Sequence, residues 1–155
     1  MTIPTTLEQF LRQRGVAYDV IEHFPTSTAR ETARAAEIPP ARLAKAVLMR
    51  DDGGYLLAVL PAAYQVEKGA VWRLTHRTLD FATEDEATRL FKDCERGALP
   101  ALAPAYGLDA LVDEHLDHAE EVWLEAGDHR HLIHMSGPQF LELMAGARHG
   151  CFCHA

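Results

Sequence analysis

Apolar residues recur at two spacings along this chain of 155 residues, and the spacings predict both helices and strands. A first helix is expected from Leu7 to Arg14, where apolar residues lie three or four positions apart. Thr5 and Glu8 can form a capping box before it, and Gly15 can end it. Later helices, most of which begin with a Ser/Thr and Glu/Gln capping pattern, are expected over 28–37, 66–74, 83–91 and 136–145. Strands are expected over 16–24, 43–50, 55–61, 79–82, 108–113, 121–125 and 131–135.

The clearest strand pair flanks the turn 51–54, Asp-Asp-Gly-Gly, whose residue types are those of tight reversals. Both flanking runs are apolar at successive positions, which predicts a hairpin covered on both faces. The order of the elements is not a regular alternation of strand and helix. We therefore predict an α/β (mixed α+β) fold, with a mixed, largely antiparallel sheet flanked by helices, in one domain spanning 1–155.

Composition and charge narrow the functional class. Hydrophobic residues make up 48% of the chain and charged residues 25%, a globular composition. The chain shows no leader-like segment and no apolar run of transmembrane length, so we expect a cytoplasmic protein without a membrane partner. The formal net charge of −8 disfavours a DNA-binding role and restricts any nucleic-acid contact to a small area. The odd number of cysteines, three, argues against a disulfide framework.

Lys45 precedes the buried part of the predicted hairpin and is therefore fixed in space by the strand that it introduces. Its ammonium group is a compact charge suited to holding a phosphate or carboxylate. A lysine in this position is also typical of a solvated strand end, or of a sheet edge where the charge prevents pairing with another strand. The lysine by itself leaves these alternatives open.

Two further segments carry candidate binding residues. His23 and Thr28 bracket the turn at Pro25, so their side chains could converge at one edge of the sheet; the alternative is that Thr28 only caps a helix. Later, the run Gly97-Ala98-Leu99-Pro100 lies in a long loop over 93–107. Its glycine and proline fix a backbone shape whose free N–H groups could approach a ligand closely, although an ordinary surface loop has the same residues.

Two clusters invite a metal interpretation, and the spacing disfavours both. His129 and His131 would share one face of a strand while His134 points to the other, so a substrate-facing His131 or His134 is the better interpretation. The tail Cys151-Phe152-Cys153-His154 could bind a soft metal, but it is terminal and short of partners, which favours loose packing.

The sequence also lacks the motifs of covalent catalysis and of nucleotide binding. It contains no Gly-x-Ser-x-Gly elbow, no phosphate-binding Gly-x-x-x-x-Gly-Lys-[Ser/Thr] loop and no Gly-x-Gly-x-x-Gly fingerprint. Any catalysis is therefore expected to use positioning, electrostatics and a bound water. No cofactor and no metal are expected.

The ordered set of motifs resembles one family. The motifs are His23-Phe24-Pro25 with the Thr28 cap, Lys45 before the hairpin, Gly97 to Pro100, and Ala126-Gly127 followed by Leu132-Ile133-His134-Met135. Together, over about Leu7 to Ala145, they resemble the YbaK/prolyl-tRNA-synthetase-associated (editing) domain family, in its free-standing form.

The resemblance implies a partly barrel-like sheet and the hydrolysis of mischarged aminoacyl-tRNA released by a synthetase, without a metal. It implies that Lys45 holds either the phosphate of the 3′-terminal adenosine or the aminoacyl end of the substrate, and that Gly97, Ala98 and Pro100 position the terminal ribose and ester. Substrate-binding residues are then expected at His23, Phe24, Thr28, Ala46, Leu99, His131 and His134. Several members carry Asn where this chain has Ala46, and many have a second proline where it has Ala101.

The leading hypothesis is therefore a deacylase that removes a small amino acid from a mischarged tRNA, with an aminoacyl-tRNA synthetase as a further partner. The alternative is a non-catalytic module that binds a synthetase or tRNA. Hydrolysis of another small acyl ester, and a metal-dependent hydrolase, rank below these two.

Overall fold

The computed structural model describes residues 3–154, and its main feature is an eight-stranded mixed sheet. The strand order is β1-β8-β7-β2-β3-β6-β9, with β5 paired to β2 beside this path. The strands of this sheet are β1 Asp19–Glu22, β2 Leu43–Asp51, β3 Gly54–Pro61, β5 Asp80–Phe81, β6 Asp109–Asp113, β7 Glu121–Glu125, β8 His131–Ser136 and β9 Arg148–Gly150. A separate small sheet pairs β4 (Gln65–Val66) with β10 (Cys153–His154).

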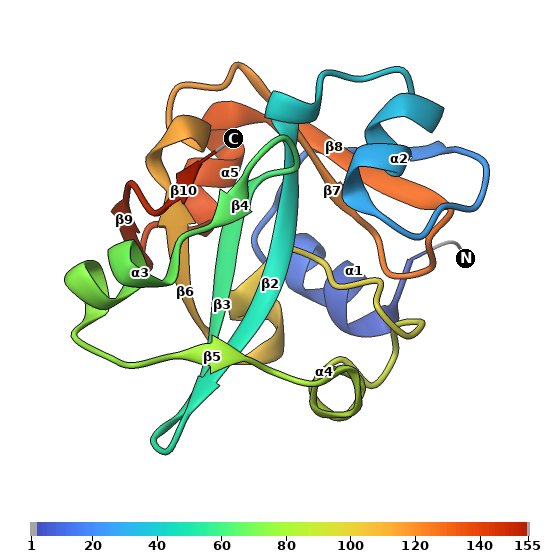
Figure 1. The fold of residues 1–155 in the computed structure, drawn as a ribbon. Coiled ribbons are helices and arrows are strands. Elements are labelled where there is room, and N and C mark those ends of the chain that lie inside the picture. Colours follow the sequence, from blue (N-terminus) through green and yellow to red (C-terminus); the bar gives the residue numbers. More distant parts are fainter. Residues whose placement is uncertain (1–2, 155) are drawn as a thin grey trace.

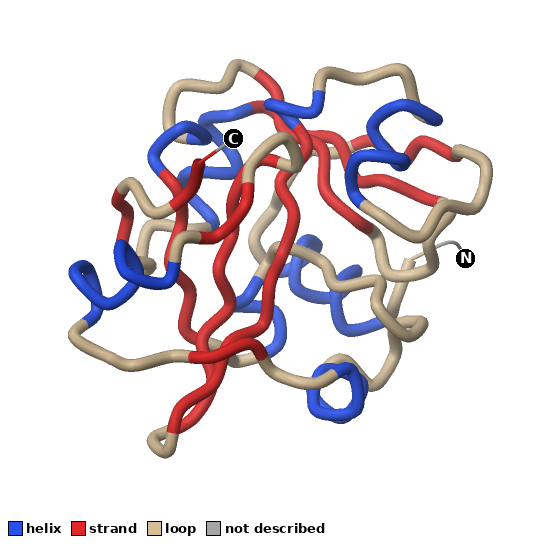
Figure 2. The backbone as a smooth tube through the Cα atoms, viewed as in Figure 1, coloured by secondary structure: helices blue, strands red, loops and turns tan. Residues whose placement is uncertain are grey.

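Five α-helices surround the strands, which gather in the middle of the molecule (Figure 2). They are α1 Thr5–Gln13, α2 Ala29–Ala35, α3 Lys68–Thr75, α4 Glu84–Leu90 and α5 Gly137–Leu143. Short 3-10 turns lie at Pro40–Arg42, Ala103–Tyr106 and Glu114–Leu116. None of the helices within residues 3–154 has the length and apolarity needed to cross a bilayer.

The β2–β3 hairpin forms the centre of the fold, as the sequence predicts, with Asp51 opposite Gly54 at its turn. Figure 1 shows these two strands running through the molecule, with α2, β7 and β8 on one side and α3 and β6 on the other. Along β3 the side chains alternate between two apolar clusters. Leu57 and Val59 belong to the larger cluster, and Leu56 and Ala58 to the one covered by α3. Both faces are therefore covered.

The two edges of β2 differ, and this difference creates an opening. One edge pairs with β3 along its whole length. On the other edge, β7 pairs only with Leu43 and Ala44, and β5 only with Met49 and Arg50. Residues 45–48 therefore have no strand beside them on that edge, and Lys45 lies at the start of this gap.

The mixed sheet is confirmed, and its parallel pairs are the part that the pattern of residues did not indicate. Four pairs are antiparallel: β1–β8, β8–β7, β2–β3 and β2–β5. Three are parallel: β7–β2, β3–β6 and β6–β9. Parallel pairs join strands that are far apart in the sequence, so no local turn signal announces them.

The helix boundaries follow local capping chemistry where it exists. Thr28 with Glu31 and Thr83 with Glu86 form the predicted capping boxes of α2 and α4. The predicted box at Thr5 and Glu8 is wrong, because α1 begins at Thr5 and its N-cap, Pro4, has no side-chain hydrogen bond. The first strand is also shorter than predicted, since only Asp19–Glu22 pairs with β8.

The predicted long loop and the C-terminal tail are both packed into the core. In the predicted long loop, Ala101, Leu102 and Ala103 are fully buried against α1 and the sheet. In the tail, Phe152 is fully buried and Cys153 pairs with Val66 of β4. The prediction of a frayed C-terminal tail is therefore wrong, because a buried aromatic ring and a strand pair hold it in place.

Candidate functional site

A cavity of about 190 Å³ opens where β2 lacks a strand neighbour. It lies between the start of α2, the first half of β2, the loop after α4 and the turn between β7 and β8. Its walls are formed by Ser27, Thr28, Ala29, Thr32, Leu43, Ala44, Lys45, Ala46, Gly97, Leu99, Glu125, His129 and Leu132. Five of the residues named as site residues from the sequence line it: Thr28, Lys45, Ala46, Gly97 and Leu99.

Lys45 contributes an unpaired positive charge to this cavity. Its side chain is half-buried, and no acidic group among residues 3–154 forms an ion pair with it. Burial, and then the nearby charge of Arg30, lower the pKa of Lys45 below its ordinary value, while Cys153 acts in the opposite direction. A cation held this way gains from an anionic ligand that replaces its lost hydration.

The loop carrying Gly97 is held in place through the preceding residue, Arg96. Arg96 forms ion pairs with Glu84 and Asp85 at the start of α4, at 2.9 Å each. The Nε2 atom of His129 donates a hydrogen bond to the Arg96 carbonyl oxygen at 2.7 Å. Gly97 has φ +80°, a conformation that disfavours a side chain, and a Cβ there would lie 3.7 Å from the His129 ring.

The backbone N–H groups of this loop are not equivalent. The N–H of Ala98 donates to the Glu95 carbonyl at 3.0 Å, so Ala98 cannot offer it to a ligand without losing that bond. Ala98 itself is buried, and so is Pro100. The N–H groups of Gly97 and Leu99 have no acceptor among the described residues, and both residues line the cavity. These two groups are the available donors.

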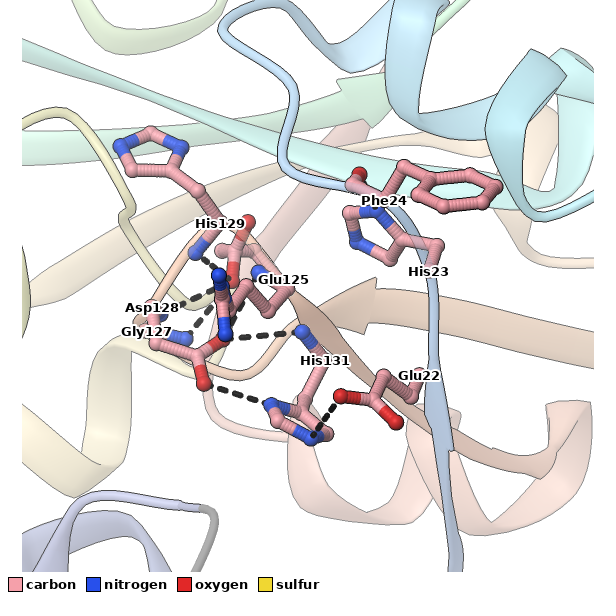
Figure 3. Close-up of polar contacts among 9 residues, drawn as sticks. Glu22, His23, Phe24, Glu125, Gly127, Asp128, His129 and His131 are labelled. Carbon is pink, nitrogen blue, oxygen red and sulfur yellow. Dashed lines mark hydrogen bonds and ion pairs between the residues drawn. The ribbon is translucent and has the colours of Figure 1, made fainter.

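Glu125, at the end of β7, is a cavity residue that the sequence analysis did not identify. Its Oε2 atom accepts hydrogen bonds from the N–H groups of Gly127, Asp128 and His129 at 2.8, 3.2 and 3.3 Å. Figure 3 shows this carboxylate inside the turn that follows β7. The Oε1 atom has no partner among the described residues, so the carboxylate keeps one free acceptor beside the cavity.

Thr28 caps α2, as the sequence predicts, and it also lines the cavity. Its Oγ1 atom accepts from the Glu31 N–H at 3.2 Å, and its N–H donates to Glu31 Oε1 at 3.1 Å. The hydrogen bonds that its carboxylate accepts from Ser27 and then from Thr28 hold the pKa of Glu31 below its ordinary value. The hydroxyl of Thr28 is thus used within the capping box, and Thr28 meets the cavity as part of its wall.

His23 and Phe24 lie outside the cavity walls. The Nδ1 atom of His23 donates to the Phe24 carbonyl at 2.6 Å, while its buried Nε2 atom has no partner. Phe24 is 83% exposed, so its side chain does not pack in the core. Convergence of His23 and Thr28 on one cavity is therefore not observed, because the turn at Pro25 separates them.

The three histidines of the 129–134 cluster go to three different places. His129 adopts φ 62° in the turn, outside any strand, so it does not share a strand face with His131 as predicted. The His131 ring lies between Asp128 and Glu22, away from the His129 ring (Figure 3). His134 stacks on Trp123 and pairs with Glu121, outside the cavity.

The cavity walls hold no set of metal ligands. Its walls carry two ligand-type side chains, Glu125 and His129, and the Oε2 atom of Glu125 and the Nε2 atom of His129 are already hydrogen-bonded. Within residues 3–154, one group of three side chains is close enough to share a metal ion. It lies outside the cavity and consists of Asp113, His115 and Cys151.

Comparisons with known proteins bear on the family and the fold of the chain. A family model described as "Aminoacyl-tRNA editing domain" matches residues 23–143. A search of curated protein sequences finds no match. A solved structure, reported as that of a candidate trans-editing enzyme for prolyl tRNA synthetase, superposes with a TM-score of 0.83 at 26% identity. The match covers 97% of this chain and 96% of that one.

Two other solved structures show the fold alone. A hypothetical protein superposes with a TM-score of 0.82 at 21% identity over 96% of this chain and 99% of its own. A candidate signal transduction protein from Marinobacter aquaeolei VT8 superposes with a TM-score of 0.79 at 24% identity. That match covers 99% of this chain and 31% of the larger protein.

Proposed function

Because the chain belongs to the aminoacyl-tRNA editing domain family, and is therefore an aminoacyl-tRNA deacylase, we propose that it removes a small amino acid from a mischarged tRNA in the cavity beside Lys45. The single observation that carries the proposal is the half-buried, unpaired ammonium group of Lys45 at the wall of that cavity. Within residues 3–154, no ion pair uses this charge.

Lys45 anchors the anionic 3′ end of the tRNA. The neighbouring charge of Arg30 adds to the positive potential at this position, so a phosphate group there is attracted by two cations. The chain as a whole is acidic, with a formal net charge of −8, which limits favourable contact with tRNA to this local area. A single-stranded acceptor end is small enough to be held in this way.

The size of the cavity matches the amino acid rather than the nucleoside. At about 190 Å³ it is smaller than the pockets of about 300–1,000 Å³ that hold drug-sized ligands. The apolar walls at Ala44, Ala46 and Leu132 suit a short side chain. The free Oε1 atom of Glu125 suits the α-ammonium group, which every unmodified aminoacyl ester carries. The terminal adenosine then lies at the mouth of the cavity.

The chemistry is attack of water on an ester that is already activated. Water adds to the ester carbonyl, the ester C–O bond breaks, and the free amino acid and a tRNA with a free ribose hydroxyl are released. The N–H groups of Gly97 and Leu99 are the donors available to stabilise the oxyanion, and Pro100 helps to fix their direction. The ribose hydroxyl of the substrate assists the attacking water, and no metal takes part. The reaction belongs in the cytoplasm, next to the synthetase that releases the substrate.

The test is the release of amino acid from tRNAs mischarged with alanine, serine or cysteine. We expect turnover of at least one substrate, and a loss of about 10- to 150-fold in kcat/KM for Lys45→Ala, the range of a charge-assisted hydrogen bond. Lys92→Ala is the matched control, because it removes the same charge from the chain at an exposed position. Equal turnover by Lys45→Ala and wild type would overturn the anchoring role. Tight tRNA binding without any turnover would favour the non-catalytic module.

A further inference from the structure

The C-terminal tail brings two cysteines to a buried carboxylate and a histidine, far from the cavity residues in sequence. Phe152 is fully buried between the two cysteines. Cys151 and Cys153 both have their thiols close to His115. Both thiols are free, Cys151 being exposed and Cys153 half-buried.

The partners of these thiols come from the end of β6 and the turn after it. One ligand atom each of Asp113, His115 and Cys151 lies within 4.8 Å of the others. The Sγ atom of Cys153 lies 4.0 Å from the Nδ1 atom of His115. Two ligands bound to one zinc ion at about 2.0–2.3 Å lie less than about 4.6 Å apart, so small side-chain rotations are enough to close this group around an ion.

Asp113 and His115 are already held in position. Asp113 is fully buried; its Oδ1 atom accepts from the His115 N–H at 2.9 Å and from Nδ1 at 2.5 Å, and its Oδ2 atom accepts from the Phe152 N–H at 3.0 Å. The Tyr64 ring packs on the His115 ring, with centroids 5.1 Å apart. A buried carboxylate that fixes both a histidine and the backbone between two cysteines is a built arrangement, not a chance meeting of surface groups.

We propose that Cys151, Cys153, His115 and Asp113 bind one zinc-class divalent ion that fastens the C-terminal tail to the end of β6. Two thiols, an imidazole nitrogen and one carboxylate oxygen match the ligand types and the number that tetrahedral zinc takes. The thiols bind as thiolates and release their protons to solvent, and the ion replaces the proton between His115 Nδ1 and Asp113. The role is structural, because the same tail contributes Phe152 to the core and β10 to the small sheet.

The experiment measures Zn²⁺ and Co²⁺ binding by the reduced full-length chain. We expect one ion per chain, with Co²⁺ giving thiolate-to-metal charge-transfer absorption. The affinity for Zn²⁺ should fall by more than about 100-fold in Cys151→Ser/Cys153→Ser, since loss even of an outer partner costs about 10–100-fold. Cys94→Ser is the matched control, because Cys94 lies beside Tyr106 at another place in the fold.

His115→Ala tests the imidazole, with His118→Ala as its control, since His118 is an exposed histidine on the same segment. Zn²⁺ should raise the melting temperature of wild type, Cys94→Ser and His118→Ala. It should not raise that of Cys151→Ser/Cys153→Ser or His115→Ala. Zn²⁺ affinity that is equal in wild type and Cys151→Ser/Cys153→Ser would overturn the proposal. So would Co²⁺ spectra without thiolate absorption. The cysteine variant keeps Phe152 and Asp113, so its folding can be checked independently.

Discussion

The Nε2 atom of His129 lies 2.7 Å from the carbonyl oxygen of Arg96, and this hydrogen bond joins the turn after β7 to the loop that carries Gly97. A carbonyl oxygen only accepts, so Nε2 carries the proton and the bond fixes the tautomer of the ring. The cavity therefore depends on a contact between two segments that are 33 positions apart in the sequence.

Loss of this hydrogen bond should weaken deacylation without unfolding the protein. In His129→Ala the loop loses its tie to the turn, and a hydrogen bond is worth about 0.5–1.5 kcal/mol net. We expect kcat/KM to fall by about 2- to 10-fold with little change in the melting temperature. Single-turnover hydrolysis of mischarged tRNA measures the effect. His118→Ala serves as the control, and an equal fall there would contradict the assignment.

Glu125 should recognise the α-ammonium group of the substrate. Glu125→Gln keeps the shape and an oxygen acceptor for the turn but removes the charge, so we expect kcat/KM to fall by about 10- to 150-fold for free aminoacyl esters. The decisive comparison is with N-acetylated aminoacyl-tRNA, which has no ammonium group. Wild type should discriminate against it, and Glu125→Gln should lose that discrimination. Glu121→Gln is the control, since Glu121 pairs with Arg42 and His134 outside the cavity.

The pH dependence of tRNA binding should show the loss of the Lys45 charge. Its pKa is lowered, so the anchoring charge is fully present below the folded-state pKa and is lost as the pH rises through it, before the ordinary value of 10.5. For stability the sign is opposite: the unfolded chain holds this proton more tightly, so stability rises with pH over the same window. Binding of a non-hydrolysable amide-linked aminoacyl-tRNA should weaken there. Lys45→Arg stays charged at these pH values, so the loss of binding at alkaline pH should disappear in this variant. If the loss is unchanged in Lys45→Arg, a group other than Lys45 causes it.

The parts of this structure that the sequence predicted are those that local chemistry determines. Thr28 and Glu31 lie three positions apart, so their capping box is visible in the sequence alone. The hairpin is equally local, because its turn and both strands are contiguous. The same locality places Lys45 at the start of a central strand.

The parts that were missed depend on contacts between distant segments. Glu125 lines the cavity only because β7 runs parallel to the first residues of β2 and then diverges, which no pattern near residue 125 indicates. Its one sequence signal was a glutamate directly before the Ala-Gly turn. The packing of the tail also depends on a distant segment. Asp113, which accepts a hydrogen bond from the Phe152 N–H, lies 39 positions from Phe152. His131 and His134 remain predicted binding residues whose side chains lie outside the cavity.

Ala46 should limit the space for the substrate side chain. Ala46 lies on β2 opposite Val59, at the unpaired edge, and lines the cavity. Valine suits a strand, so Ala46→Val adds volume to the cavity wall without a backbone penalty. One methylene in an apolar pocket changes discrimination by about 1–3 kcal/mol, which is roughly 5- to 150-fold. We therefore expect Ala46→Val to lose far more activity on the larger accepted amino acids than on alanine, measured as kcat/KM across the mischarged-tRNA panel.

Ala145→Val adds the same atoms at an exposed position after α5 and should leave the kcat/KM ratios between the substrates unchanged. A uniform loss on all substrates in Ala46→Val would mean that Ala46 faces the tRNA end rather than the amino acid.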